Sequence, residues 1–305
     1  MFDQGGGFSD RKPPAYGVQT GNRRQQQSHE TRRRLFEEIE ASIGRPLVTY
    51  FTSFNYQVMI DDNDANMLEG VLQDLDLSNG LALMISTPGG NGLAAERIIN
   101  VCRNYSGTGE YQAIVPGKAK SAGTVICLGA SRIVMGRSAE LGPIDPQWSP
   151  RDSTMAFSLP DLVEGYDELF ATAVAATGRL EPYLQQLSHY DAREVKQFRS
   201  LIDLSEDIAV RALKTGMMKD ESEKDICRRM KLFLDPKATK THGRAIYFAT
   251  ARECGLTIEE VDPKSDIWGK LYELHVRSDN FVSTSAAKCI ESKEGSFAVG
   301  APSRD

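Results

Sequence analysis

Short runs of apolar residues alternate along this chain with longer stretches in which apolar residues recur every three or four positions. The runs are rich in Ile, Val and Leu and end at Gly, Pro or polar residues, which predicts buried strands at residues 47–52, 81–86, 111–115 and 132–135. Helical periodicity fills the intervals at residues 65–75 and 92–105. Alternation of strand and helix is typical of a parallel sheet covered by helices, so the pattern predicts an α/β fold.

The second half of the sequence has a different pattern. Helical periodicity dominates residues 159–234, and it returns after residue 243 and at residues 267–276, with a short strand predicted at 256–261. Residues 283–305 are rich in Ser, Gly and Lys and read as irregular. The pattern predicts four parts: a basic arm (1–28), an amphipathic helix (29–44), the main domain (45–278) and a C-terminal tail (279–305).

The N-terminal arm nearly lacks apolar residues, so it cannot bury enough surface to order itself. Residues 11–34 contain seven basic residues and one acid, Glu30. Such an arm could bind an acidic partner or a membrane surface, but we favour a solvated tail. The following helix places Leu35, Phe36, Ile39 and Ile43 on one face, which should pack on the domain or on a neighbouring subunit.

Composition narrows the class of protein. The 305 residues are 40% hydrophobic and carry a net charge of −6, which gives no general nucleic-acid signature. The five cysteines are scattered without a CxxC pair, so we expect a reducing, cytoplasmic setting without a disulfide framework or zinc site. The acidic run at 61–64 lacks the spacing of a calcium loop, and Asp64 is interpreted as a helix cap. We expect neither metal nor cofactor.

Two Gly-containing segments carry the candidate chemistry. The sequence STPGG (86–90) ends the second strand, and KSAGT (120–124) separates the third strand from a small apolar helix. Ser121 is therefore predicted where strand gives way to helix, among backbone N–H groups without intrahelical partners. Acyl transfer needs such donors, because negative charge develops on the carbonyl oxygen under attack. The structural alternative is that PGG only ends a strand and that Ser121 only caps a helix.

Four blocks together resemble one family. They are STPGG (86–90), VPGKAKSAGT (115–124), IVMGRSAELGPIDPQ (133–147) and THGRAIYFATARECGL (241–256). Over residues 47–272 the chain resembles the serine dehydrogenase proteinase family of the ClpP/crotonase superfamily, and it is more distantly similar to signal peptide peptidase A. The resemblance implies stacked strand-strand-helix units with a helical C-terminal flank, and homo-oligomers built as rings or stacked trimers.

The resemblance also implies roles for single residues. Ser121 would be the nucleophile, and the backbone N–H groups of Gly90 and Ala122 would form the oxyanion hole. Gly89 and Gly90 would leave room for the substrate backbone, since a side chain there would block its approach.

The general base is not settled by the resemblance. Where Clp-type proteases carry a histidine, this chain has Asp145, and no lysine occurs between Lys120 and Lys196. The remaining candidates for the base are Lys118, Lys120, His189 and His242. His242 is slightly favoured because Lys120 adjoins the serine in sequence. Asp145 would then orient the base, or simply form a turn between two prolines.

These residues predict a serine peptidase that cleaves polypeptides through an acyl-enzyme on Ser121. The chain lacks a GxxxxGK[ST] loop, so any dependence on ATP would come from a partner. One alternative is a non-catalytic oligomeric scaffold or peptide-binding protein with the same fold. Another is acyl-CoA chemistry of the crotonase type, but those enzymes use an oxyanion hole without a nucleophilic serine.

Overall fold

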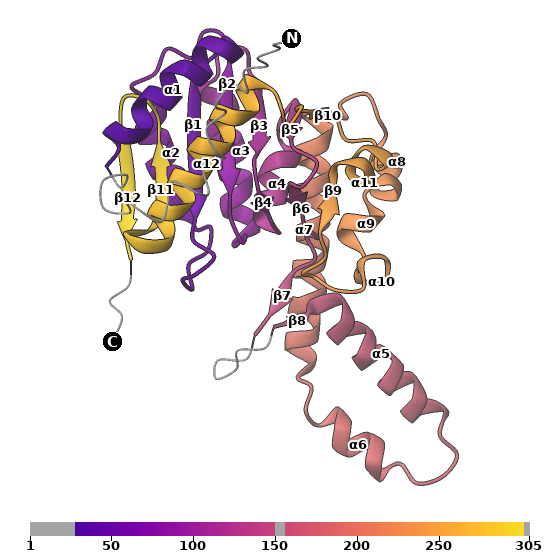
Figure 1. Cartoon of the computed structure of the whole chain (residues 1–305). Coiled ribbons are helices and arrows are strands. Elements are labelled where there is room, and N and C mark those ends of the chain that lie inside the picture. Colours follow the sequence, from indigo (N-terminus) through magenta and orange to yellow (C-terminus); the bar gives the residue numbers. More distant parts are fainter. Residues whose placement is uncertain (1–27, 150–155, 302–305) are drawn as a thin grey trace, which may run out of the picture.

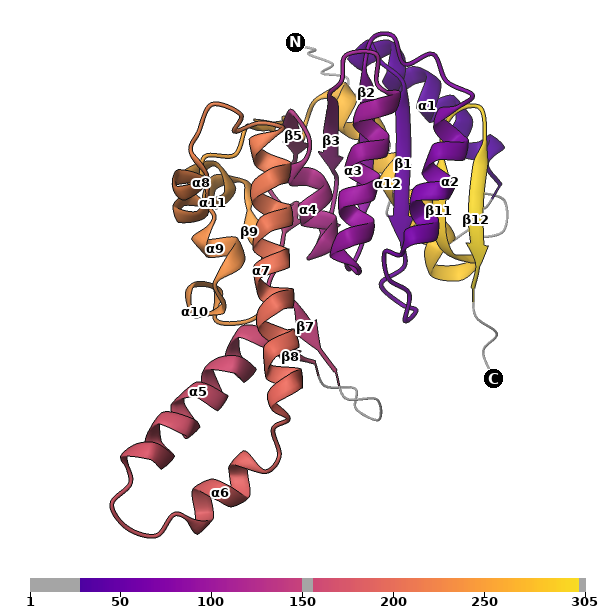
Figure 2. The same cartoon turned by 180° about the vertical axis from the view of Figure 1, so that it is seen from behind.

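The computed structural model describes residues 28–149 and 156–301, and its centre is a seven-stranded sheet. The strand order is β10-β5-β3-β2-β1-β11-β12, with helices on both faces (Figures 1 and 2). The strands are β1 (Leu47–Thr52), β2 (Leu81–Ser86), β3 (Tyr111–Val115), β5 (Arg132–Met135), β10 (Ile258–Glu260), β11 (Ala286–Glu291) and β12 (Ser296–Gly300).

The predicted parallel sheet is confirmed. β1, β2, β3 and β5 pair in parallel, and the four strands have the bounds that the apolar runs predict. Each of these runs is mostly apolar because helices cover both faces of the sheet. The short strand predicted near residue 258 is β10, which pairs in parallel with β5. The α/β class is therefore confirmed.

Alternate side chains of each strand enter two separate cores. Val48 and Tyr50 of β1 pack on the side of α2 (Asp62–Leu72) and α3 (Gly92–Tyr105). Leu47 and Phe51 pack on the opposite side, against α1 (Glu30–Ile43) and α12 (Asp266–Thr284). This alternation follows from the period of two along a strand.

A second, three-stranded sheet lies beside the first and carries the candidate site. Its order is β4-β6-β9, formed by β4 (Lys118–Ala119), β6 (Glu140–Leu141) and β9 (Ile246–Tyr247). β4 follows β3 and leads into α4 (Ala122–Leu128), a helix whose residues are all buried. β6 runs parallel to β4, whereas β9 runs antiparallel to β6.

The predicted helical flank is confirmed, and part of it extends away from the body. In both views α5 and α6 project beyond the sheets, joined to the body through α7 (Figures 1 and 2). These elements and their neighbours are β7 (Gln147–Trp148), β8 (Phe157–Ser158), α5 (Leu159–Ala175), α6 (Glu181–Leu187), α7 (Ala192–Lys214), α8 (Glu223–Arg229), α9 (Lys231–Leu234), α10 (Pro236–Thr239) and α11 (Phe248–Glu253). Within residues 28–149 and 156–301, none of the helices combines the length and the apolar character that crossing a bilayer requires.

The tail predicted at residues 279–305 is wrong for its described part. α12 continues to Thr284, β11 pairs antiparallel with β1, and β12 pairs with β11. Every residue of β11 is buried, including Lys288 and Glu291. These two charges suggested an exposed segment, but each one has an ionic partner inside the protein. The main domain therefore does not end at residue 278.

The apolar stripe of α1 is covered within the same chain. Leu35, Phe36 and Ile39 pack in the core shared with α12, so this stripe needs no neighbouring subunit. The prediction that α1 packs on the domain is confirmed, and the alternative of packing on a neighbouring subunit is not needed to cover the stripe. The predicted basic arm lies outside the described residues, apart from residue 28.

Candidate active site

Ser121 has an unusual backbone conformation. Its dihedrals are φ 48° and ψ −119°, at the position directly before α4. Residues other than glycine rarely adopt such a conformation, which costs on the order of 1–3 kcal/mol and persists only where the surroundings enforce it. The serine is partly exposed, and its side chain does not cap the helix. Thus the strand-to-helix position predicted for Ser121 is confirmed, while the helix-cap interpretation is wrong.

The two Gly-containing segments lie side by side. A Cβ atom placed on Gly89 would lie 2.6 Å from Cβ of Ser121, so only glycine allows the two backbones to approach this closely. Gly89 and Gly90 have φ values of 113° and 153°, in the region that favours glycine. Thr87 fixes their register, because its N–H donates to the Lys118 carbonyl at 2.9 Å and its carbonyl accepts from Lys120 N–H at 3.0 Å.

The opposite edge of the PGG segment contacts Ile60. Ile60 N–H donates to the Gly89 carbonyl at 2.8 Å, and the Ile60 carbonyl accepts from Asn91 N–H at 2.9 Å. A Cβ atom on Gly90 would lie 2.3 Å from the Ile60 nitrogen. The segment is therefore held between Ile60 on one edge and β4 on the other.

This arrangement sets the direction of the Gly90 N–H. In a trans peptide the carbonyl and the following N–H point in opposite directions. Because the Gly89 carbonyl faces Ile60, the Gly90 N–H faces the other edge, where β4 leads to Ser121. Among the described residues, neither this N–H nor that of Ala122 donates to a backbone carbonyl. Both groups are free to bind an oxyanion.

Asp145 and His242 meet although 97 positions separate them in sequence. His242 Nδ1 lies 2.8 Å from Asp145 Oδ1, and the other carboxylate oxygen accepts from Gln147 Nε2 at 2.6 Å. The Asp145 side chain is 1% exposed and that of His242 28%, so the carboxylate is fixed while the ring reaches solvent. A carboxylate on Nδ1 favours the tautomer that carries its proton there, which leaves Nε2 able to accept one.

The small sheet brings the three candidate segments to one end. Ser121 follows β4 by two residues, Asp145 follows β6 by four, and His242 precedes the antiparallel β9 by four. All three therefore leave the same end of the sheet. Among the described residues the Ser121 hydroxyl makes no hydrogen bond to His242 or to either lysine. Catalytic contacts often form only when substrate binds.

The lysine candidates are engaged elsewhere. Lys120 Nζ lies 3.1 Å from Glu140 Oε2 and donates to the Leu141 carbonyl at 3.2 Å, which directs it along β6. Lys118 is exposed and lies 3.6 Å from the same carboxylate. His189 is exposed and follows α6, which projects away from α4 in both views (Figures 1 and 2).

The surroundings of Asp145 are acidic. The pKa of Asp161 is raised, first by burial and then by the negative charges of Asp145, Glu164 and Asp235. The positive charge of Lys237 acts in the opposite direction on this carboxyl.

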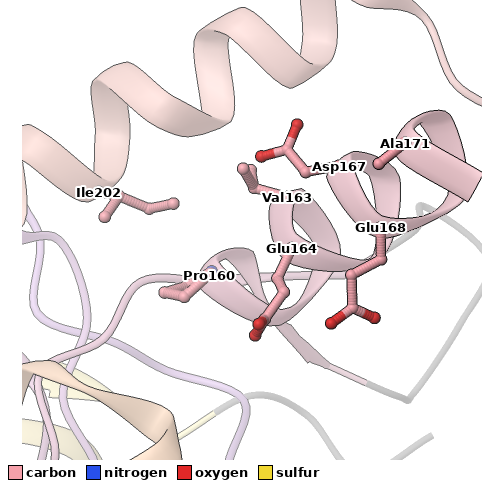
Figure 3. Close-up of a pocket in the computed structure, with 7 residues that line it drawn as sticks. All are labelled: Pro160, Val163, Glu164, Asp167, Glu168, Ala171 and Ile202. Atoms are coloured by element: carbon pink, nitrogen blue, oxygen red, sulfur yellow. The ribbon is translucent and has the colours of Figure 1, made fainter. Parts of the chain in front are cut away.

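A surface hollow elsewhere has no part in this site. It lies between α5 and α7 and is lined by Pro160, Val163, Glu164, Asp167, Glu168, Ala171 and Ile202 (Figure 3). Two of its carboxylates already have ionic partners, since Glu164 pairs with Lys237 and Asp167 with Arg199. None of its lining residues is a candidate for the chemistry.

Three contributors were not predicted from the sequence. Ile60 orients the Gly89–Gly90 peptide, Glu140 binds Lys120, and Gln147 holds Asp145. Ile60 and Glu140 carry no local signal, because their roles depend on segments distant in sequence. Gln147 lies within the quoted GPIDPQ block and could have been suggested by its spacing of two from Asp145.

Part of this chain matches a known protein family. Residues 30–163 match the family of ClpP-like SDH-type serine proteinases. The resemblance stated from the sequence is confirmed over this segment, which holds Ser121, both glycines and Asp145, whereas His242 lies beyond it. The match indicates a peptidase-type fold.

Two curated relatives come from Methanocaldococcus jannaschii. Uncharacterized protein MJ0137 is 46% identical over 65 residues, or 21% of this chain and 22% of that protein. Uncharacterized protein MJ1495 is 40% identical over 111 residues, or 36% of this chain and 34% of that protein. The matched segments therefore cover about a fifth of MJ0137 and about a third of MJ1495.

Proposed function

We propose that this protein is a serine peptidase that hydrolyses peptide bonds of polypeptides through an acyl-enzyme on Ser121. Ser121 Oγ attacks the substrate carbonyl while His242 Nε2 accepts its proton. Asp145 holds the Nδ1 side of the ring and stabilises the imidazolium. His242 then protonates the leaving amine, and water, activated by the same ring, hydrolyses the ester.

The oxyanion of each tetrahedral intermediate would bind the N–H groups of Gly90 and Ala122. One such donor typically contributes about 10²–10³-fold in rate. The observation that carries the proposal is the strained Ser121 packed on Gly89, with the Gly90 N–H facing the serine's edge of the segment. Backbone strain of this kind clusters at active sites, where the surrounding structure enforces it.

The test combines active-site labelling with hydrolysis. A fluorophosphonate probe should label the full chain at Ser121, and a small activated ester should be hydrolysed. Ser121→Ala should remove both, with a loss of several orders of magnitude in rate. Ser188→Ala, which changes a serine after α6 in the projecting part, is the matched control and should keep both. Hydrolysis undiminished in Ser121→Ala would refute the peptidase proposal.

A second candidate is a non-catalytic scaffold of the same fold, which binds peptides without cleaving them. It is favoured by the absence of a hydrogen bond from the Ser121 hydroxyl to a base among the described residues. Correct folding together with no labelling of the parent protein would support it. In either case we propose the stacked strand-strand-helix arrangement of the family and a homo-oligomer.

A further inference from the structure

A buried lysine lies behind the candidate oxyanion hole. Lys288 of β11 is 4% exposed, and its ammonium contacts two carboxylates. Nζ lies 2.5 Å from Asp61 Oδ2 and 2.9 Å from Asp64 Oδ2, while Tyr50 OH donates to the same Asp64 oxygen at 2.7 Å. Burying an ammonium is unfavourable unless it is paired, so this cluster is fixed by its own contacts.

The same carboxylates build the start of α2. Asp61 is the N-cap, and Asp64 at the third helical position closes a reciprocal capping box, so the prediction of Asp64 as the cap itself is wrong by three residues. Asp64 Oδ2 also accepts from the Asp61 N–H at 2.8 Å. The lysine, the cap and the backbone of Asp61 therefore form one connected unit.

This unit ends directly at Ile60, the residue before the cap. Ile60 N–H binds the Gly89 carbonyl, and that bond determines where the Gly90 N–H points. A chain of direct contacts thus runs from Lys288 through Asp61 and Ile60 to the proposed oxyanion donor.

We propose that Lys288 is a positioning residue that sets the orientation of the Gly90 N–H by fixing Asp61 and Ile60. The proposal rests on the proposed peptidase function. It gives β11 an effect on catalysis, although this strand is distant from Ser121 in sequence. When the contacts of Lys288 are lost, the Gly89–Gly90 peptide can rotate. This rotation weakens binding of the oxyanion more than binding of the ground-state substrate.

The test uses the full chain and two substitutions. Lys288→Met removes the ammonium. Asp61→Ala removes only one carboxylate contact of that ammonium, and the Asp61 side chain is 58% exposed. This second variant keeps the buried Lys288–Asp64 pair and should therefore fold. For hydrolysis of a small ester, each should lower kcat by about tenfold or more with KM nearly unchanged, because a donor of this kind contributes about 10²–10³-fold. Fluorophosphonate labelling of Ser121 should slow in parallel.

A matched control separates positioning from general destabilisation. Arg32→Met removes another buried cation, which pairs with Glu291 on the same strand β11 rather than with Asp61 or Asp64. With rates expressed per folded molecule, this control should keep the parent kcat. Parent values of kcat in both Lys288→Met and Asp61→Ala would overturn the positioning role alone. A parent protein that is folded but unlabelled would refute the peptidase function and this proposal together.

Discussion

The buried pair between Arg32 and Glu291 allows a direct test of how α1 and β11 are held together. Arg32 Nε lies 2.7 Å from Oε2 and Nη2 lies 2.5 Å from Oε1, so both oxygens are bound in a two-point arrangement. The two side chains are 0% and 1% exposed. The guanidinium also lies over the Phe281 ring at 4.5 Å, and Ser296 Oγ donates to the carboxylate at 2.8 Å.

We expect Glu291→Gln to be strongly destabilising. The amide keeps the size of the side chain but removes the negative charge that faces the buried guanidinium, and breaking a buried pair of this kind costs about 3–5 kcal/mol. This is a large part of the 5–15 kcal/mol that typically stabilises a folded protein. The matched control is Glu38→Gln, which removes the exposed pair of Glu38 with Arg34 and its second pair with Lys270. Surface pairs of this kind contribute little to stability, because solvent screens their charges.

The assay is urea denaturation followed by circular dichroism. With a slope of about 3 kcal/mol per molar urea, the midpoint of Glu291→Gln should fall by about 1–1.7 M, and that of Glu38→Gln should hardly move. The double variant Arg32→Met with Glu291→Leu should recover much of the loss, since both charges of the buried pair are then removed together. A shift for Glu291→Gln no larger than that of the control would refute the reasoning.

The same pair should also affect the folding stability of the protein at acidic pH. Burial alone would raise the pKa of Glu291, but the hydrogen bond and charge of Arg32 and the Ser296 hydroxyl outweigh it, so the net pKa is lowered. A carboxyl with a lowered folded-state pKa adds stability above its unfolded pKa of about 4.3 and loses it as the pH falls further. Below that pH the parent should therefore lose stability more steeply than Glu291→Gln.

Four further outcomes are expected. His242→Ala should lose about 10²–10⁴-fold in ester hydrolysis while Lys120→Ala keeps most of it, and the reverse pattern would transfer the role of base to the lysine. Gly90→Ala should lower kcat and probe labelling at least about tenfold, because its Cβ would lie 2.3 Å from the Ile60 nitrogen; parent rates would contradict the role given to that peptide. Burial lowers the pKa of His275 to about 4, below its unfolded value of about 6.5. The contribution of His275 to folding stability should therefore be constant above pH 6.5 and fall by at most about 3 kcal/mol as the pH drops toward 4, so urea midpoints between these pH values should fall more in the parent than in His275→Gln. Light scattering at micromolar protein should give a mass larger than a dimer, with or without residues 1–28, and a monomer mass would rule the oligomer out.

Much of the sheet could be predicted because its physics is local. A strand of a parallel sheet is covered on both faces, so β1, β2, β3 and β5 are apolar runs that end at Gly, Pro or polar residues. The importance of Gly89 and Gly90 could also be predicted, because their requirement is local. Each has a backbone conformation that favours glycine over other residues.

Only the tertiary structure could place the residues whose meaning depends on distant partners. β11 contains Lys288 and Glu291, which in sequence indicate an exposed segment. They are buried because Asp64 lies 224 positions away from the lysine, and Arg32 lies 259 positions away from the glutamate. Burial of a charge is tolerated only when such a partner is present, and no local sequence pattern shows where that partner lies.

The candidate site divides in the same way. The sequence determined that Ser121 stands between a strand and a helix, because both neighbouring elements have their own periodicity. It left the base open among histidines and lysines. The fold decided that Asp145 meets His242 and that Lys120 turns to Glu140, because β4, β6 and β9 lie side by side although they are distant in sequence. Hydrogen bonds between strands, rather than any spacing along the chain, bring these groups together.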